Sequence, residues 1–187
     1  MLSPRSWFKL PNQYVVSAGQ PISCSPRPTM PESNAELIER FYEAFQRVDA
    51  EAMAACYAPD VQFSDPVFGV LRGREASDMW RMLLARAEEF SLQYSDIEAI
   101  GQTASARCVA TYRFSQTGRM VTNRIDSRFT IRDGLIFEQH DTFSLYRWSC
   151  QALGFKGLLL GWTPFMRNKI HEQARKGLVS FRKQVKS

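Results

Sequence analysis

The chain has 187 residues, of which 44% are hydrophobic and 12% aromatic, so one domain can bury a sizeable core. This composition excludes collagen-like and wholly disordered chains, and because no apolar run approaches about 18 residues, no transmembrane helix is predicted. The net charge of +5 arises at the two ends: residues 1–31 carry three basic and no acidic residues, residues 32–155 carry 13 basic and 18 acidic, and residues 156–187 carry eight basic and one acidic. Because the central part is mildly acidic, nucleic acid is not an expected partner.

The first 31 residues contain six of the nine prolines and show no apolar periodicity. We therefore predict a disordered, proline-rich tail over residues 1–31. The absence of acidic residues there is typical of a targeting peptide, but the prolines oppose the amphipathic helix that such a peptide needs. A translation start at Met30 is the simpler alternative.

Three helices are predicted after the tail. Ser33 and Glu36 form a capping-box pattern before apolar residues at helical spacing. Asp49 can cap a second, short helix, on which we place Tyr57. Residues 61–65 indicate a short strand ended by a proline, and a third helix is expected from after Gly73 to about residue 86.

From Phe90 onward, apolar and polar residues alternate, which is typical of antiparallel strands with one buried face. Residues 132–134 (Arg-Asp-Gly) are a hairpin-turn signal. Three helices followed by such a meander predict an α+β fold, in which a curved antiparallel sheet wraps around the N-terminal helices.

The last segment, residues 151–187, is predicted to be a basic amphipathic helical extension. Thr163 and Pro164 form an N-cap and first-turn pair. Ile170 and Leu178 belong to its apolar stripe, and the basic residues mostly lie off that stripe. The simplest interpretation packs the stripe on the sheet and leaves the cations in water. Contact with a membrane surface is the alternative.

Two segments, ELIERFYEAFQRVDAEAMAACYAPDVQFSDPVFG and FTIRDGLIFEQHDTF, resemble the nuclear transport factor 2-like superfamily, which includes SnoaL-like domains and ketosteroid isomerases. The resemblance covers about residues 33–145 and implies a SnoaL-like domain over residues 32–150. It implies a cone-shaped sheet, an apolar pocket between sheet and helices, and a homodimer formed through the outer face of the sheet. This fold carries isomerases, cyclases, hydrolases, dehydratases and non-enzymatic binders, so it does not name a reaction.

Asp65 is the first candidate catalytic residue. It shares a strand face with two apolar residues, and burial would raise its pKa toward the range of a useful base. Its Asp-Pro-Val context resembles that of the ketosteroid isomerase base. The alternative is that Asp65 caps a turn before Pro66. In those isomerases a helix tyrosine and an aspartate of a late strand donate to the oxyanion. Phe41 replaces the tyrosine here, and an ungapped alignment places Asp126 at the aspartate position, which makes Asp126 a further candidate. The alternation puts Asp126 on the polar face, where it would be the solvated partner of an arginine, and one deletion in the alignment would place Ser127 at this position instead.

Asp141 and His140 form the second candidate pair. The alternation directs Asp141 toward the pocket and His140 outward. Polyketide cyclases of this fold use an aspartate from a late strand, so the resemblance implies an acid–base role for Asp141. The alternative is a satisfied buried carboxylate.

The remaining candidates are aromatic residues that could bind a ligand or simply form core: Phe41, Tyr57, Phe63, Trp80, Tyr112 and Phe129.

No nucleotide, metal or serine-hydrolase motif is present, so we expect neither a cofactor nor a metal. The four cysteines form no metal-binding or disulfide pattern and are predicted to be reduced thiols of a cytoplasmic protein. Two functions remain open. One is a cofactor-free enzyme that uses a buried carboxylate on a small apolar molecule; the other is a non-catalytic ligand-binding or dimerisation module.

Overall fold

The computed structural model of the protein describes residues 33–185, so the tail predicted over residues 1–31 lies outside the described part. The described residues form six helices: α1 (Asn34–Gln46), α2 (Ala50–Ala55), α3 (Arg74–Leu84), α4 (Leu145–Leu153), α5 (Phe155–Leu160) and α6 (Pro164–Gln184). They also form six strands: β1 (Tyr57–Asp65), β2 (Gly69–Arg72), β3 (Glu88–Ile100), β4 (Thr103–Phe114), β5 (Arg119–Arg132) and β6 (Leu135–Thr142).

The helix starts follow the predicted capping residues. Ser33 Oγ accepts the Glu36 backbone N–H at 3.2 Å, and the Glu36 carboxylate accepts the Ser33 N–H at 2.7 Å. Asp49 Oδ1 caps α2 by accepting the Ala52 N–H at 2.9 Å. The placement of Tyr57 on this helix is wrong: α2 ends at Ala55, and Tyr57 opens β1.

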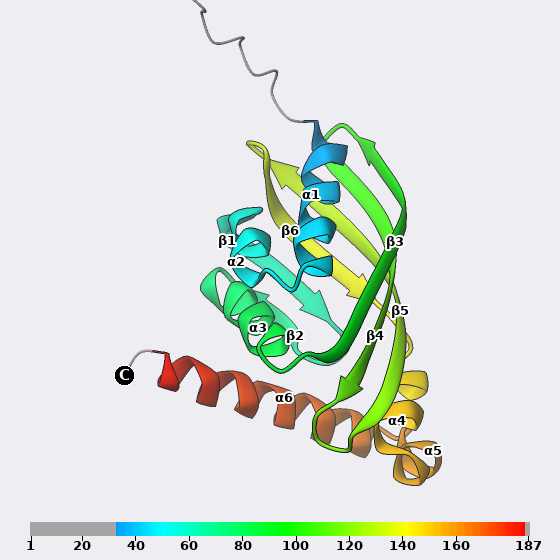
Figure 1. The fold of residues 1–187 in the computed structure, drawn as a ribbon. Helices are drawn as coiled ribbons and strands as arrows, with labels where there is room; N and C mark the ends of the chain where they lie inside the picture. Colours follow the sequence, from blue (N-terminus) through cyan, green and yellow to red (C-terminus); the bar gives the residue numbers. More distant parts are fainter. Residues whose placement is uncertain (1–32, 186–187) are drawn as a thin grey trace, which may run out of the picture. The chain divides into compact units, whose positions relative to one another are not determined.

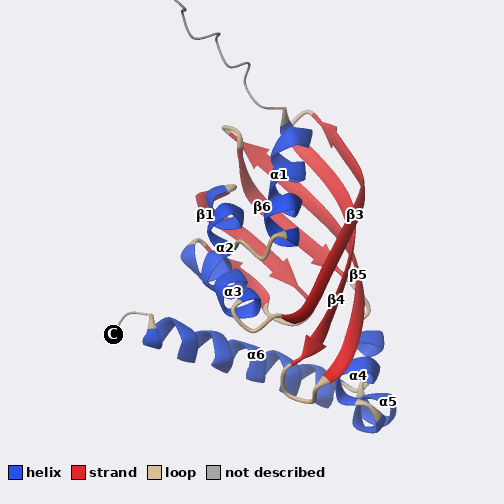
Figure 2. Ribbon diagram, in the orientation of Figure 1, coloured by secondary structure: helices blue, strands red, loops and turns tan. Residues whose placement is uncertain are grey.

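One curved sheet holds all six strands in the order β2-β1-β6-β5-β4-β3 (Figures 1 and 2). Every neighbouring pair is antiparallel except β1 and β6, which run parallel. The predicted α+β fold with a curved sheet around the N-terminal helices is thus confirmed, with one parallel pairing that the alternation did not reveal. At the β5–β6 turn, Asp133 (φ 53°) and Gly134 (φ 73°) are both left-handed, as a two-residue hairpin requires.

Aromatic side chains fill the space between the helices and the sheet. Phe41 of α1 packs with Trp80 of α3 and with Phe129 of β5, at ring-centroid distances of 6.1 and 6.2 Å. Phe45 stacks on Phe90 of β3 at 5.3 Å. Large buried rings of this kind contribute most of the apolar area that stabilises such a core.

The C-terminal region forms three helices, and the expected domain boundary at residue 150 falls within α4. A Cβ atom at Gly157 would lie only 1.9 Å from the Ser149 carbonyl oxygen, so glycine is what permits α5 to approach α4. Thr163 caps α6 and Pro164 occupies its first position, as predicted. Within residues 33–185, none of the helices is long and apolar enough to cross a membrane.

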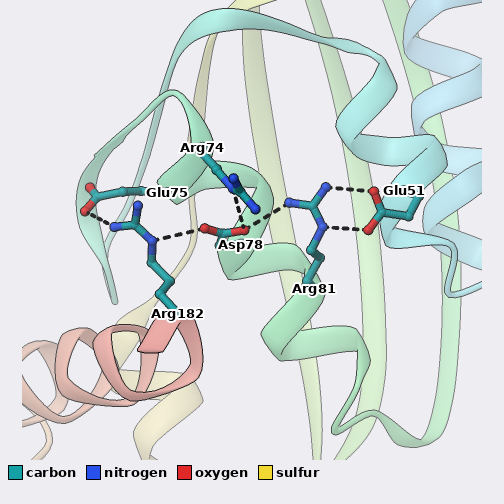
Figure 3. Close-up of polar contacts among 6 residues, drawn as sticks. All are labelled: Glu51, Arg74, Glu75, Asp78, Arg81 and Arg182. Carbon is teal, nitrogen blue, oxygen red and sulfur yellow. Dashed lines mark hydrogen bonds and ion pairs between the residues drawn. The ribbon is translucent and has the colours of Figure 1, made fainter. Parts of the chain in front are cut away.

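Helix α6 is attached to α3 by ion pairs (Figure 3). Arg182 donates to Glu75 at 2.8 Å and to Asp78 at 3.0 Å. The buried Asp78 also accepts a hydrogen bond from Arg81. Arg81 in turn donates two hydrogen bonds, of 2.6 and 2.7 Å, to the Glu51 carboxylate. The simple interpretation that the cations of α6 all lie in water is therefore wrong for Arg182, because α3 presents two carboxylates to it.

Candidate functional site

A cavity of about 730 Å³ lies between the concave face of the sheet and helices α3 and α6. Its walls are mainly apolar, and Phe63, Trp80 and Phe90 are among them. A cavity of this size suits a small organic ligand. Polar side chains also line it; they include Asp65, Tyr112, Asn123 and Asp141, and basic residues such as Lys156 and Lys169.

The parallel pairing of β1 with β6 brings the two aspartates together. Ser64 and His140 are register partners, so the next residue along each strand, Asp65 and Asp141, lies at the same level. Because successive side chains alternate between the faces of a sheet, both carboxylates face away from Ser64 and His140 and toward the cavity. The inward directions predicted for Asp65 and Asp141 thus agree with the structure.

Asp65 combines a turn-forming role with a shifted pKa. Its Oδ1 accepts the backbone N–H groups of Val67 at 3.0 Å and Phe68 at 2.5 Å. Burial nevertheless raises its pKa to about 7, with a smaller contribution from the negative charge of Asp141. Its other oxygen, Oδ2, accepts neither of these two bonds. Asp65 is therefore partly protonated near neutral pH, as a general base or acid must be.

Asp141 is held by neighbouring side chains through one carboxylate oxygen. Its Oδ1 accepts the Ser127 hydroxyl at 2.7 Å and the Gln139 amide at 3.0 Å, and the Tyr42 hydroxyl donates to Ser127 at 2.9 Å. Burial raises the pKa of Asp141 to about 6, although the two direct hydrogen bonds oppose this shift. The second carboxylate is thus fixed in position and titrates closer to neutrality than an exposed aspartate.

The hydrogen-bond network continues from Asp141 into the core. The side-chain oxygen Oε1 of Gln139 accepts the Tyr57 hydroxyl at 2.6 Å, and the Trp80 indole N–H donates to that hydroxyl at 2.8 Å. Burial raises the pKa of Tyr57 well above its ordinary value, so its proton stays in place. A chain from α3 through β1 to β6 therefore orients the Gln139 amide toward Asp141.

Tyr112 and Asn123 supply uncharged polar groups to the cavity. The Tyr112 hydroxyl accepts the Trp148 indole N–H at 2.8 Å, and among the described residues its own proton has no acceptor. The negative charge of Asp65 contributes to the raised pKa of Tyr112, after burial, so the two groups are near one another. Asn123 is buried, and its side-chain amide has no hydrogen-bond partner among the described residues. Both can therefore donate to a bound ligand.

Two predicted catalytic residues lie outside this site. His140 is exposed on the outer face of the sheet, where its Nδ1 lies 2.7 Å from Ser64 Oγ. Asp126 also faces outward and accepts from Arg107 at 3.2 Å. Asp126 and His140 lie outside the site because successive side chains of a strand point to opposite faces of the sheet, and their neighbours Ser127 and Asp141 point inward.

The six predicted ligand-binding aromatics divide into two groups. Phe63, Trp80 and Tyr112 line the cavity. Phe41, Tyr57 and Phe129 do not; they are buried against one another, with Phe41 lying 5.5 Å from Tyr57 and 6.2 Å from Phe129 between ring centroids. These three side chains lie in the core, where Phe41 of α1 packs against the other two.

Three residues of the site, Asn123, Gln139 and Tyr42, were missed as functional candidates, and Ser127 was considered only as an alternative to Asp126. On β5, Asn123 and Ser127 occupy positions of the alternation whose side chains point inward, together with apolar residues. A polar residue at such a position could have indicated a functional site. Gln139 carries the same signal on β6. Tyr42 of α1 reaches the site through its hydroxyl group, which donates to Ser127 Oγ.

Helix α6 completes the wall of the cavity. Met166, Lys169 and Ile170 line it from this helix. His171 of the same helix lies with its ring Nδ1 3.0 Å from the carbonyl oxygen of Val67, which is two residues after Asp65. The C-terminal extension is thus part of the site and contacts the turn that holds the candidate base. Within residues 33–185, no group of three or more metal-ligating side chains is arranged to hold a metal ion.

A family model for the SnoaL-like domain matches residues 38–139 of the chain. No curated protein matches the sequence. A proposed polyketide cyclase from Xanthomonas campestris pv. campestris is similar in structure, with a TM-score of 0.53 and 26% identity, over 62% of this chain and 93% of that one. An LEH-like epoxide hydrolase from M. tuberculosis has a TM-score of 0.54 and 23% identity, over 70% and 92%. A Catenulispora acidiphila protein with a ketosteroid isomerase-like fold, in complex with trimethylamine, has a TM-score of 0.57 and 20% identity, over 69% and 98%.

Proposed function

Given that the chain belongs to the SnoaL-like domain family, we propose that it is a cofactor-independent enzyme that moves a proton on a small apolar carbonyl compound. The observation that carries this proposal is that Asp65 and Asp141 line one largely apolar cavity, together with Tyr112 and Asn123. The similar solved structures include a proposed polyketide cyclase, which is consistent with an apolar substrate.

In the proposed reaction, Asp65 removes a proton from the carbon next to the substrate carbonyl. Its pKa of about 7 suits this step, because a base works best when its pKa lies near the working pH. The electron pair of the broken C–H bond moves onto the carbonyl oxygen. Asp65 then returns the proton to the same or to another carbon, so the net reaction is an exchange or an isomerisation.

In this reaction, the hydroxyl of Tyr112 stabilises the developing oxyanion by donating a hydrogen bond to it. Its hydroxyl already accepts from Trp148 and has its own proton available, which makes it a fixed donor rather than a group that must reorient. Asn123 offers a second N–H donor in the same cavity. Asp141 has a positioning role: its charge helps to raise the pKa of Asp65.

Hydrogen–deuterium exchange tests this function directly. Small apolar ketones such as 1-tetralone, 1-decalone and androstenedione would be incubated with the protein in D₂O, and deuterium uptake next to the carbonyl would be followed by mass spectrometry. We expect catalysed uptake for at least one ketone. Asp65→Asn should lower the exchange rate by about two to four orders of magnitude while the variant still folds and binds.

Asp126→Asn is the matched control, because Asp126 is an aspartate of the same domain that faces away from the cavity. It should leave the exchange rate unchanged. Equal loss in both variants, or no effect of Asp65→Asn, would contradict the role of Asp65.

One observation favours a second candidate function. The two backbone hydrogen bonds to Asp65 Oδ1 are those of a turn-forming aspartate, which a non-catalytic binding module would equally contain. Saturable binding of a ketone, measured by saturation-transfer NMR, without any catalysed exchange would support this alternative.

A further inference from the structure

A cluster of exposed large apolar side chains lies on α5 and at the start of α6. Phe155, Trp162 and Phe165 are 73%, 69% and 68% exposed, and the three leucines of α5, Leu158, Leu159 and Leu160, are also exposed. All six lie within eleven consecutive residues. A cluster of this kind is unusual on a soluble surface and marks a site of interaction.

The charge around this apolar cluster has one sign. Lys156, Arg167 and Lys169 lie within residues 154–171, and that stretch contains no acidic residue. Arg167 is exposed and has no ion-pair partner among the described residues. Aromatic and leucine side chains flanked by unpaired cations are the combination that binds the interface of an anionic membrane.

The cavity connects with the same segment. Phe155 and Lys156 of α5 line the cavity, as do Met166, Lys169 and Ile170 of α6. The elements that carry the apolar cluster are thus also the elements around the cavity. An apolar ligand dissolved in a bilayer would have a short path into the protein if this surface rested on the membrane.

We propose that the apolar cluster Phe155, Leu158, Leu159, Leu160, Trp162 and Phe165, with its neighbouring cations, docks this protein on the surface of anionic phospholipid membranes. The apolar side chains enter the headgroup region, and Arg167 contacts lipid phosphates. The proposed attachment is to the membrane surface, through side chains of α5 and α6. This inference does not depend on the proposed chemistry, since it concerns where the protein takes up its ligand.

Vesicle flotation with the full chain tests the proposal. The probes are vesicles of phosphatidylcholine alone and vesicles in which about one third of the lipid is phosphatidylglycerol. We expect at least about tenfold tighter binding to the anionic vesicles, and loss of that preference at high salt, because salt screens exposed charges. A blue shift of the Trp162 emission, absent in Trp162→Phe, should accompany binding.

Two variants and two matched controls locate the surface. The double variant Trp162→Ser/Phe165→Ser removes exposed apolar groups, and Arg167→Glu reverses one cation; each should weaken binding by about tenfold or more. Ile100→Ser, at an apolar residue that is 79% exposed elsewhere, and Arg124→Glu on the sheet should bind like the parent.

Three results would overturn the proposal. The first is no binding to either vesicle, and the second is binding that the cluster variants do not change. The third comes from sedimentation: if Trp162→Ser/Phe165→Ser converts an oligomer into a monomer without vesicle binding by the parent, the cluster is an interface between copies of the chain.

Discussion

At the scale of single residues, the protonation of Asp65 has a consequence for stability. Its pKa is 3.8 as an ordinary aspartate and about 7 in the folded protein. Between these values the folded state holds the proton that the unfolded state has lost, so raising the pH favours unfolding. The stabilisation is complete below pH 4 and is lost as the pH rises through about 7.

Asp65→Asn should therefore be more stable than the parent at pH 8 and equally stable near pH 4. The gain at high pH should be on the order of 2 kcal/mol, since the partial exposure of Asp65 to the cavity reduces the full effect. Urea unfolding at both pH values measures it. A difference between the two proteins that does not vary with pH would contradict the raised pKa.

Tyr112→Phe separates the chemistry from ligand binding. Loss of one oxyanion donor should lower the exchange rate about a hundredfold with little change in ketone affinity. The Trp148 N–H loses its acceptor, which costs about 1 kcal/mol of folding stability. Exchange rates and thermal unfolding give the two readouts. The control is Tyr146→Phe, at a tyrosine outside the cavity lining; if both variants exchange equally fast, Tyr112 is not the donor.

At the scale of secondary-structure elements, α6 is held where it can close the cavity. Arg182 bonds Glu75 and Asp78 of α3, while His171 and Arg175 contact the backbone of Val67 and Val70. Because Asp78 is buried, each arginine that it loses leaves part of its charge uncompensated. The attachment of α6 therefore depends on a few charged contacts as well as on its apolar face.

Arg182→Met should destabilise the protein by roughly 1–3 kcal/mol, the range for hydrogen bonds to charged groups. It should also weaken ketone binding, because Met166 and Ile170 of α6 line the cavity. Chemical unfolding and ligand titration check both effects. Arg167→Met is the matched control on the same helix, since Arg167 has no partner there; an Arg182→Met protein as stable as this control would mean that the α3–α6 ion pairs contribute nothing.

At the scale of the whole molecule, the outer face of the sheet is a second surface of interest. A groove of about 540 Å³ lies on it, lined by Ser64, Ser105, Arg128 and His140 among others. Arg107 and Arg124 are exposed on the same face of β4 and β5. A concave polar surface of this kind is suited to contact with a second copy, so the homodimer stays a prediction.

Sedimentation velocity tests the homodimer. The parent should sediment as a dimer at micromolar concentration, and Arg128→Glu should shift it toward the monomer, because it reverses a charge in the groove on the proposed contact face. Arg167→Glu, which lies away from the sheet, should leave the oligomer unchanged. A parent protein that sediments only as a species of 21.5 kDa would contradict the prediction.

Local patterns were sufficient for much of the fold. Ser33, Asp49 and Thr163 cap their helices as predicted, because capping depends on side chains within three residues of one another. The two-residue alternation correctly turned Asp141 inward and His140 outward, since a strand has only two faces. These features could be predicted because each rests on short-range geometry.

The composition of the site depended on contacts between distant segments. Asp65 and Asp141 are 76 residues apart and meet only because β1 pairs in parallel with β6, a register that neither strand encodes alone. Arg182 donates a hydrogen bond to Asp78, which is 104 residues away in the sequence. Alternation and helical spacing predict on which face of a strand or helix a side chain lies, but they do not predict which residues of other elements pack against that face. The tertiary structure therefore decided which polar residues share the cavity and how the C-terminal helix closes it.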